Sequence, residues 1–150
     1  MKKNVTALIL LTLSLTCCQQ RTEKIEEKYL NKAIKEANVD SNYQWLVILP
    51  GLGCHGCMQE AEYFMTRYIG NEHILFVLTN ISSLKILQQK IEVRIDEHTN
   101  IYVDRENLFD IHTNNRIYPC VVQLKDGKVF NHSFQSPQND AFYQLKQQFK

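Results

Sequence analysis

Neither sign of charge dominates this sequence, since 17 Lys and Arg residues stand against 16 Asp and Glu residues, for a formal net charge of +1. The sequence has no basic stripe of the kind that binds nucleic acid and no acidic run that predicts a charged tail. It also lacks internal repeats, low-complexity segments and any apolar run long enough to span a bilayer. These absences leave one small domain as the expected content of the 150 residues.

Residues 1–18 have the features of a bacterial secretion signal. Two lysines form a positive start, and the apolar run Val5–Leu15 is too short to cross a membrane. The segment ends Leu15-Thr16-Cys17-Cys18, which resembles a lipobox, where a cysteine is lipidated and becomes the mature N-terminus. Cys18 fits best, Cys17 is the alternative, and an ordinary cleaved signal is the other interpretation. Every interpretation places the domain outside the cytoplasm, and a lipid would anchor it to a bacterial membrane on the periplasmic side.

The residues after the signal divide into a tether and a first helix. Residues 19–27 are polar and are expected to form a short tether. Apolar residues then recur at helical spacing as far as Asn38, at Tyr29, Leu30, Ala33, Ile34 and Ala37. The predicted domain therefore covers residues 28–150.

The central stretch of the sequence joins a buried strand to an amphipathic helix. The apolar run Trp45–Leu49 predicts a strand, and Pro50–Gly53 ends it. Cys54-His55-Gly56-Cys57 comes next, and from Cys57 apolar residues recur at helical spacing as far as Ile69. The two cysteines therefore lie where a strand turns into the first turn of a helix.

This position suits redox chemistry. Unpaired N–H groups give a helix start a partial positive charge, which favours the thiolate form of Cys54. The spacing brings Cys54 and Cys57 within one helical turn, close enough for a disulfide. By analogy with such sites, Cys54 is expected to attack a substrate and the more enclosed Cys57 to resolve the mixed disulfide. His55 either stabilises the thiolate when charged or is merely exposed to solvent.

The rest of the chain alternates strands and helices. Ile74–Leu78 is a second apolar strand, which completes a βαβ unit with two parallel strands. Ser82 or Ser83 is expected to cap the next helix, whose end the pattern does not define. The remaining predictions are a strand at residues 100–104, a short helix at 105–114, a strand at 121–124, a turn at 126–127, an antiparallel strand at 128–134 and a last helix from Ser136.

This order of elements resembles the thioredoxin fold. The extra helix and strand around residues 82–103 resemble the insert of the membrane-tethered, extracytoplasmic TlpA/ResA-like thioredoxins. The specific parts are the C-x-x-C motif and the segment Tyr118–Val129, which looks like the family's proline, strand, Asp-Gly turn and second strand. The resemblance covers residues 43–150. It implies an α/β fold with a central mixed sheet, flanking helices and a helix–strand insert before the proline-led strand.

The activity that the resemblance implies is thiol–disulfide exchange with proteins and with a membrane redox partner. Cys54 would be the nucleophile and Cys57 the resolving thiol. Pro119 would be a cis-proline facing the disulfide, and the backbone of Tyr118 would pair with a bound substrate chain. No metal and no cofactor other than the Cys54–Cys57 disulfide is expected, the redox direction is open, and nothing predicts more than a monomer.

Three features depart from the family pattern. Gly53 stands where the family usually has an aromatic residue, and the dipeptide between the cysteines is His-Gly instead of the commoner Gly-Pro. A histidine there favours a stable thiolate, hence a more oxidising couple. Ile48 stands where thioredoxin has a buried acid, so the proton acceptor for Cys57 is expected to be Glu60, Glu62 or water.

Other interpretations of the cysteines stay open. Cys54 and Cys57 could form an inert structural disulfide, whereas a zinc site would need four ligands and the sequence has no second C-x-x-C motif. A soft-metal carrier would bind Cu(I) through Cys54, Cys57, Cys120 and a histidine. Cys120 is either a small core residue or a third thiol beside the redox pair, and Asp104 is expected to cap the helix after it. The other histidines are expected to be surface or core residues: His73, His98, His112 and His132.

Overall fold

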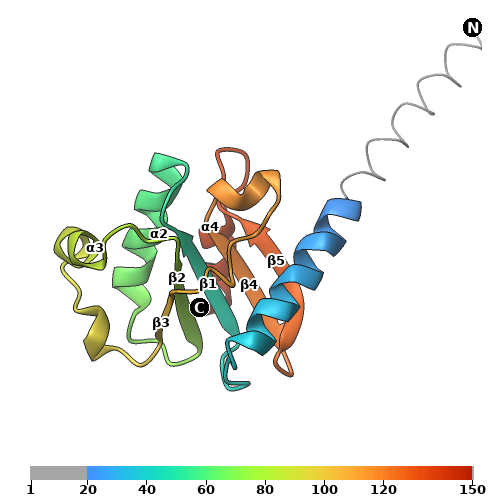
Figure 1. Cartoon of the computed structure of the whole chain (residues 1–150), viewed down its shortest axis with the longest axis horizontal. Coiled ribbons are helices and arrows are strands. Elements are labelled where there is room, and N and C mark those ends of the chain that lie inside the picture. Colours follow the sequence, from blue (N-terminus) through green and yellow to red (C-terminus); the bar gives the residue numbers. More distant parts are fainter. Residues whose placement is uncertain (1–19, 150) are drawn as a thin grey trace, which may run out of the picture.

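The computed structural model describes residues 20–149, which form an α/β fold with a five-stranded mixed sheet between helices (Figure 1). This confirms the predicted α/β class and its central mixed sheet. Residues 1–18, with the predicted lipidation at Cys18 or Cys17, lie outside the described part. In chain order the elements are a helix at residues 20–36 (the N-terminal helix), β1 (Trp45–Pro50), α2 (His55–Tyr68), β2 (Ile74–Thr79), α3 (Leu84–Ile91), η1 (Ile95–Glu97), β3 (Ile101–Asp104), η2 (Asn114–Ile117), β4 (Cys120–Lys125), β5 (Lys128–Phe134), α4 (Ala141–Lys146) and η3 (Gln147–Phe149).

The strands lie in the order β3-β2-β1-β4-β5. β1 pairs with β2 and β2 with β3 in parallel, whereas β4 lies antiparallel to β1 and to β5. The predicted βαβ unit is therefore present, with α2 as its crossover. Asp126 and Gly127 have φ values of 53° and 71°, the left-handed conformation that a tight hairpin turn requires. The predicted turn between β4 and β5 is confirmed.

Two apolar clusters cover the two faces of the sheet. Side chains alternate along a strand, so Val47 and Leu49 of β1 pack in the cluster of α2, α3 and α4, whereas Leu46 and Ile48 pack on the other face. That second face is covered by the N-terminal helix and by the loop after β3. All six residues of β2 are buried because helices or loops lie on both of its sides.

The tether predicted for residues 19–27 is wrong for the described part of that segment. Residues 20–27 belong to the N-terminal helix, and Glu26 is only 1% exposed. The segment is rich in Glu, Lys and Arg, which are good helix formers. Glu26 also lies four residues, about one helical turn, before the buried Leu30, so both side chains lie on the side of the helix that packs against the sheet. The described residues 20–27 therefore pack as part of the domain, which the sequence predicts to begin at residue 28.

Two further predictions of helices need correction. Residues 105–113 form turns instead of a helix, because Asn107 has a φ of 55° and the Asp104 carboxylate accepts the N–H groups of Leu108 and Phe109. The last helix begins at Ala141 instead of Ser136, since Asp140 provides its N-terminal cap. No helix within residues 20–149 is both long and apolar enough to cross a membrane.

Candidate redox site

The two cysteines of the C-x-x-C motif form a disulfide where β1 leads into α2. Cys54 and Cys57 are joined, with their Cα atoms 5.3 Å apart. Cys54 is the N-terminal cap of α2 and is half-buried, whereas Cys57 is 6% exposed and lies in the first turn of the helix. Cys54 is therefore the more accessible of the two cysteines, as the sequence predicts.

The start of α2 leaves its positive end next to Cys54. The Cys54 carbonyl accepts the Met58 N–H at 2.9 Å, but no side chain caps the first N–H groups. The first turn also holds no acidic residue. The helix dipole is thus not neutralised locally, which favours an anionic sulfur at this position. His55, the first residue of α2, is exposed beside it.

A second segment, η2 with the two residues after it, lies against the motif. The Cys54 N–H donates to the Ile117 carbonyl at 3.0 Å. A Cβ atom on Gly53 would lie 2.1 Å from the same oxygen, which is far too close for any side chain. This approach explains why glycine stands where the resemblance leads one to expect an aromatic residue. Tyr118 is half-buried and Pro119 is buried directly after this contact.

The predicted cis-proline is wrong, since no peptide bond in the described part of the chain is cis. Tyr118 has φ −110° and ψ 140°, the extended conformation that a residue before a trans proline favours. The trans form of such a bond is preferred by about 0.5–1 kcal/mol, and the extended backbone here accommodates it. The Tyr118 N–H donates to the Asn115 carbonyl at 2.9 Å. Of its backbone groups, only the carbonyl is therefore suited to pair with a bound chain.

Cys120 is a buried free thiol in the cluster of the N-terminal helix. It is 1% exposed and packs among apolar side chains that include Ile48 and Val122. Burial raises the pKa of the Cys120 thiol, and the nearby Glu26 carboxylate raises it further. Its environment is that of a small core residue, on the face of the sheet opposite the main contacts of α2.

The two carboxylates of α2 that are candidates to accept the Cys57 proton have other partners. Glu62 forms an ion pair with Lys90 of α3, and Glu60 accepts a hydrogen bond from the Gln135 side chain. Both contacts hold α2 against neighbouring elements. The sequence suggests Glu60, Glu62 or water as the acceptor of the Cys57 proton. Because both carboxylates have other partners, water that reaches the half-buried Cys54 is the remaining candidate.

Two apolar side chains are exposed beside the disulfide. Leu52 is 73% exposed in the loop before Cys54, and Ile117 is 43% exposed in the segment facing it. They belong to the two segments that meet where the Ile117 carbonyl accepts the Cys54 N–H. These two exposed side chains are the apolar rim of the site.

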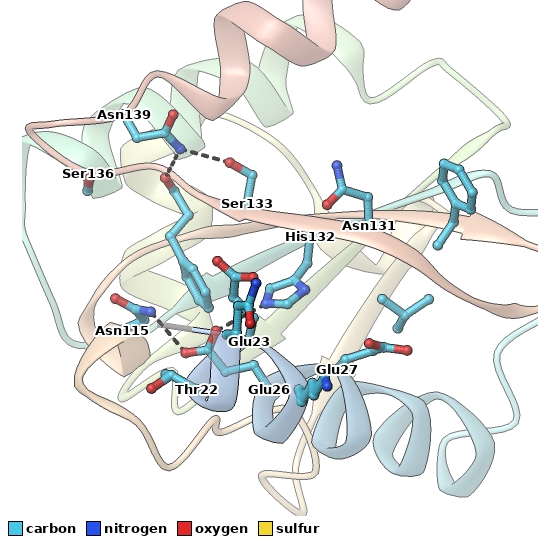
Figure 2. A pocket seen from close by; sticks show the side chains of 15 residues that line it. Thr22, Glu23, Glu26, Glu27, Asn115, Asn131, His132, Ser133, Ser136 and Asn139 are labelled. Carbon is cyan, nitrogen blue, oxygen red and sulfur yellow. Dashed lines mark hydrogen bonds and ion pairs between the residues drawn. The ribbon is translucent and has the colours of Figure 1, made fainter. Parts of the chain in front are cut away.

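Sequence reasoning missed a polar cluster behind η2. Glu26 accepts hydrogen bonds from Thr113 Oγ1 at 2.6 Å and Asn115 Nδ2 at 2.9 Å, and its second oxygen lies 3.1 Å from His132 Nε2. Figure 2 shows Glu26, Asn115 and His132 directed toward one another between the N-terminal helix and β5. The helical spacing could have indicated that Glu26 is buried, because Glu26, Leu30 and Ile34 are four residues apart and lie on the same side of the helix.

The predicted soft-metal set is not assembled in the structure. Within residues 20–149, no three His, Cys, Asp or Glu side chains are grouped so that they could hold a metal ion. His73 and His112 are exposed, His98 is half-buried, and His132 is engaged with Glu26. A scan against protein-family models and a search among curated proteins find no match to this chain.

Proposed function

We propose that the protein is a thiol–disulfide oxidoreductase that exchanges disulfides with proteins through Cys54 and Cys57. The observation that carries this proposal is the disulfide at the start of α2, with its more exposed cysteine at the positive end of the helix. Such placement stabilises the thiolate, which is the reactive form in exchange. A disulfide that served only as a staple would need neither the exposure of Cys54 nor the uncapped helix start.

The exchange proceeds in two displacements. In the reducing direction, the Cys54 thiolate attacks a substrate disulfide, forms a mixed disulfide and releases one substrate thiolate. The Cys57 thiolate then attacks the Cys54 sulfur, which releases the second substrate thiolate and leaves the Cys54–Cys57 disulfide. Two electrons pass to the substrate. A redox partner then supplies two electrons to the Cys54–Cys57 disulfide, which restores both thiols. The same steps in reverse oxidise a substrate dithiol.

The architecture supports this proposal. A parallel βαβ unit with the motif at its crossover helix, extended by an antiparallel hairpin, is compatible with a thioredoxin-like fold. The helix α3 and the strand β3 fall within residues 82–103, which supports the proposed likeness to the insert of TlpA/ResA-like proteins. The trans peptide before Pro119 departs from that pattern, so the segment before β4 differs here from the cis-proline loop of the family.

A polypeptide is the substrate class that the rim suits best. Leu52 and Ile117 expose apolar surface in the two segments that meet at Cys54, and such surface binds apolar segments of another chain. The Tyr118 carbonyl would accept a hydrogen bond from the backbone of the bound chain. We expect the buried Cys57 to remain out of contact with the substrate until the mixed disulfide forms.

The proposed location is outside the cytoplasm, at a bacterial membrane. Figure 1 shows the start of the N-terminal helix and the start of α2 toward the same end of the sheet. Contacts of Glu26 with Asn115, and of Ile117 with Cys54, agree with this arrangement. A lipid on Cys18 would therefore hold the disulfide toward the membrane, within reach of a membrane redox partner.

The test is insulin reduction by dithiothreitol with the purified domain. We expect the wild type to accelerate the reaction and Cys54→Ser to abolish the acceleration, since the attacking sulfur is lost. Cys57→Ser should accumulate a mixed disulfide with the substrate, whereas Cys120→Ser, the matched control, should retain turnover. Equal rates for wild type and Cys54→Ser would refute the proposal. A reduction potential below about −300 mV would also count against it, because structural disulfides have such values.

A further inference from the structure

The buried carboxylate of Glu26 is the least expected polar group in the fold. It is 1% exposed and lies on the buried side of the N-terminal helix, where an apolar residue would pack more simply. Burying a carboxylate is unfavourable unless hydrogen bonds replace its lost water. Glu26 has these bonds from three side chains: Thr113, Asn115 and His132.

Two of those partners belong to the turn that contacts the motif. Thr113 is the N-terminal cap of η2, and its hydroxyl also accepts the Asn115 N–H at 3.2 Å. The Asn115 carbonyl accepts the Tyr118 N–H, and the Ile117 carbonyl accepts the Cys54 N–H. A continuous set of hydrogen bonds therefore runs from Glu26 through η2 to the backbone of the attacking cysteine.

We propose that Glu26 is a positioning residue for the redox site, which fixes η2 so that the Ile117 carbonyl and the apolar rim stay in place over Cys54. This inference rests on the proposed function. His132 holds the second carboxylate oxygen from β5, so the carboxylate is fixed from both sides (Figure 2). The disulfide is thereby coupled to the N-terminal helix, which contributes no residue to the motif.

The competing explanation is that Glu26 only attaches the helix to the domain. The same helix offers a matched control for this role. Asn31 Oδ1 accepts the Val129 N–H at 3.0 Å, which attaches the helix to β5 without touching η2. Asn31→Ala should therefore weaken the attachment and leave the geometry at Cys54 intact.

The experiment compares Glu26→Leu, Glu26→Gln and Asn31→Ala with the wild type. Three quantities are measured: insulin turnover, the rate at which dithiothreitol reduces the Cys54–Cys57 disulfide, and the amide NMR signal of Cys54. Glu26→Leu should lower insulin turnover about tenfold, because small displacements at a reacting group are costly. The reduction rate by dithiothreitol should not fall, since a released turn shields the disulfide less. The Cys54 amide signal should shift because its acceptor is displaced.

Glu26→Gln keeps an oxygen for Thr113 and Asn115, so it should restore turnover to within about threefold of the wild type. Asn31→Ala should leave all three quantities unchanged. Equal effects of Glu26→Leu and Asn31→Ala, or an unchanged Cys54 amide in Glu26→Leu, would overturn the inference. If Glu26→Leu does not fold, Asn115→Ala removes the link from the η2 side and is judged by the same criteria. If wild type lacks insulin turnover, the proposed function fails, while the dithiothreitol rate and the amide signal still test the coupling.

Discussion

The two faces of the sheet are stabilised in different ways. On one face α2, α3 and α4 pack through apolar side chains, and Phe64 stacks on Tyr68 and Phe142 with ring centroids 4.4 and 4.8 Å apart. On the other face the apolar cluster is accompanied by two buried carboxylates, Glu26 and Asp104, which are 1% and 3% exposed. The first face depends mainly on apolar area, with polar contacts such as the Glu62–Lys90 ion pair beside it. The second face depends in addition on the hydrogen bonds of its two carboxylates.

This difference has a consequence for the disulfide, which lies where the two kinds of packing meet. The apolar face holds α2, which carries Cys57, whereas the carboxylates hold the loops of the other face, including the η2 turn that contacts Cys54. Apolar contacts are non-directional, while a carboxylate with two or three donors fixes the position of its partners. We therefore expect substitutions on the first face to affect mainly stability, and those on the second to affect local geometry as well.

The largest expected effect is that of Phe64→Ala on the apolar face. Phe64 is 1% exposed, and removal of its ring leaves a cavity among Phe76, Phe142 and Tyr68. The free energy of unfolding in urea should fall by about 3–5 kcal/mol. Tyr63→Ala, one residue away on the same helix and 61% exposed, should change it by no more than about 0.5 kcal/mol. Similar losses for the two variants would contradict the assignment of this face as the apolar core.

The apolar face can be predicted from the sequence because its signals are periodic. The continuous runs in β1 and β2 and the helical spacing after Cys57 identify the βαβ unit, and the Asp-Gly pair identifies the hairpin. The motif's position also follows from these patterns. Each signal is repeated over several residues, so one misleading residue does not change the outcome.

The carboxylate-dependent face cannot be predicted in this way. Glu26 looks like one charged residue in a polar segment, and its partners lie 87 to 106 residues away in the sequence. Asp104 does cap the segment after it, as the sequence predicts, but that segment is a turn and not a helix. The cis peptide predicted before Pro119 rested on the resemblance alone, since most bonds before proline are trans. Nothing in the local sequence shows that Ile117 approaches Gly53. These features depend on contacts between segments that are distant along the chain.

The next largest effect should come from Asp104→Ala on the second face. Its two carboxylate oxygens accept the Leu108 N–H at 2.9 Å and the Phe109 N–H at 2.8 Å. Without them these donors lose their partners in a largely buried position, so the free energy of unfolding should fall by about 2–3 kcal/mol. Hydrogen exchange at the Leu108 and Phe109 amides should accelerate beyond that of β2. A uniform acceleration throughout the domain would indicate that the face unfolds only globally, which would remove the distinction between the faces.

The matched control for that variant is Asp96→Ala. Asp96 lies in an exposed ion pair with Arg94, whose hydrogen bond lowers the pKa of the Asp96 carboxyl. A carboxyl with a lowered pKa stabilises the fold above its ordinary pKa and loses this contribution as the pH falls through the folded-state value. Solvent screens an exposed pair, so the urea transition at neutral pH should not move measurably. A loss as large as that of Asp104→Ala would show that burial does not explain the difference.

Apart from the controls, the smallest expected effect is the one closest to the disulfide, and it distinguishes Gly53, directly before the motif, from Gly56 within it. At Gly53 a Cβ atom would meet the Ile117 carbonyl at 2.1 Å, whereas at Gly56 it would meet nothing within 4 Å. Gly53→Ala must therefore push η2 away from Cys54 and should lower the free energy of unfolding by about 1–2 kcal/mol. Gly56→Ala, within α2, should raise it by up to about 1 kcal/mol, because alanine favours helix. Changes of opposite sign in the free energy of unfolding would show that η2 contacts the chain at Gly53 and not at Gly56. Equal signs would mean that this contact does not restrict the loop, and the coupling between Glu26 and Cys54 would lose its last step.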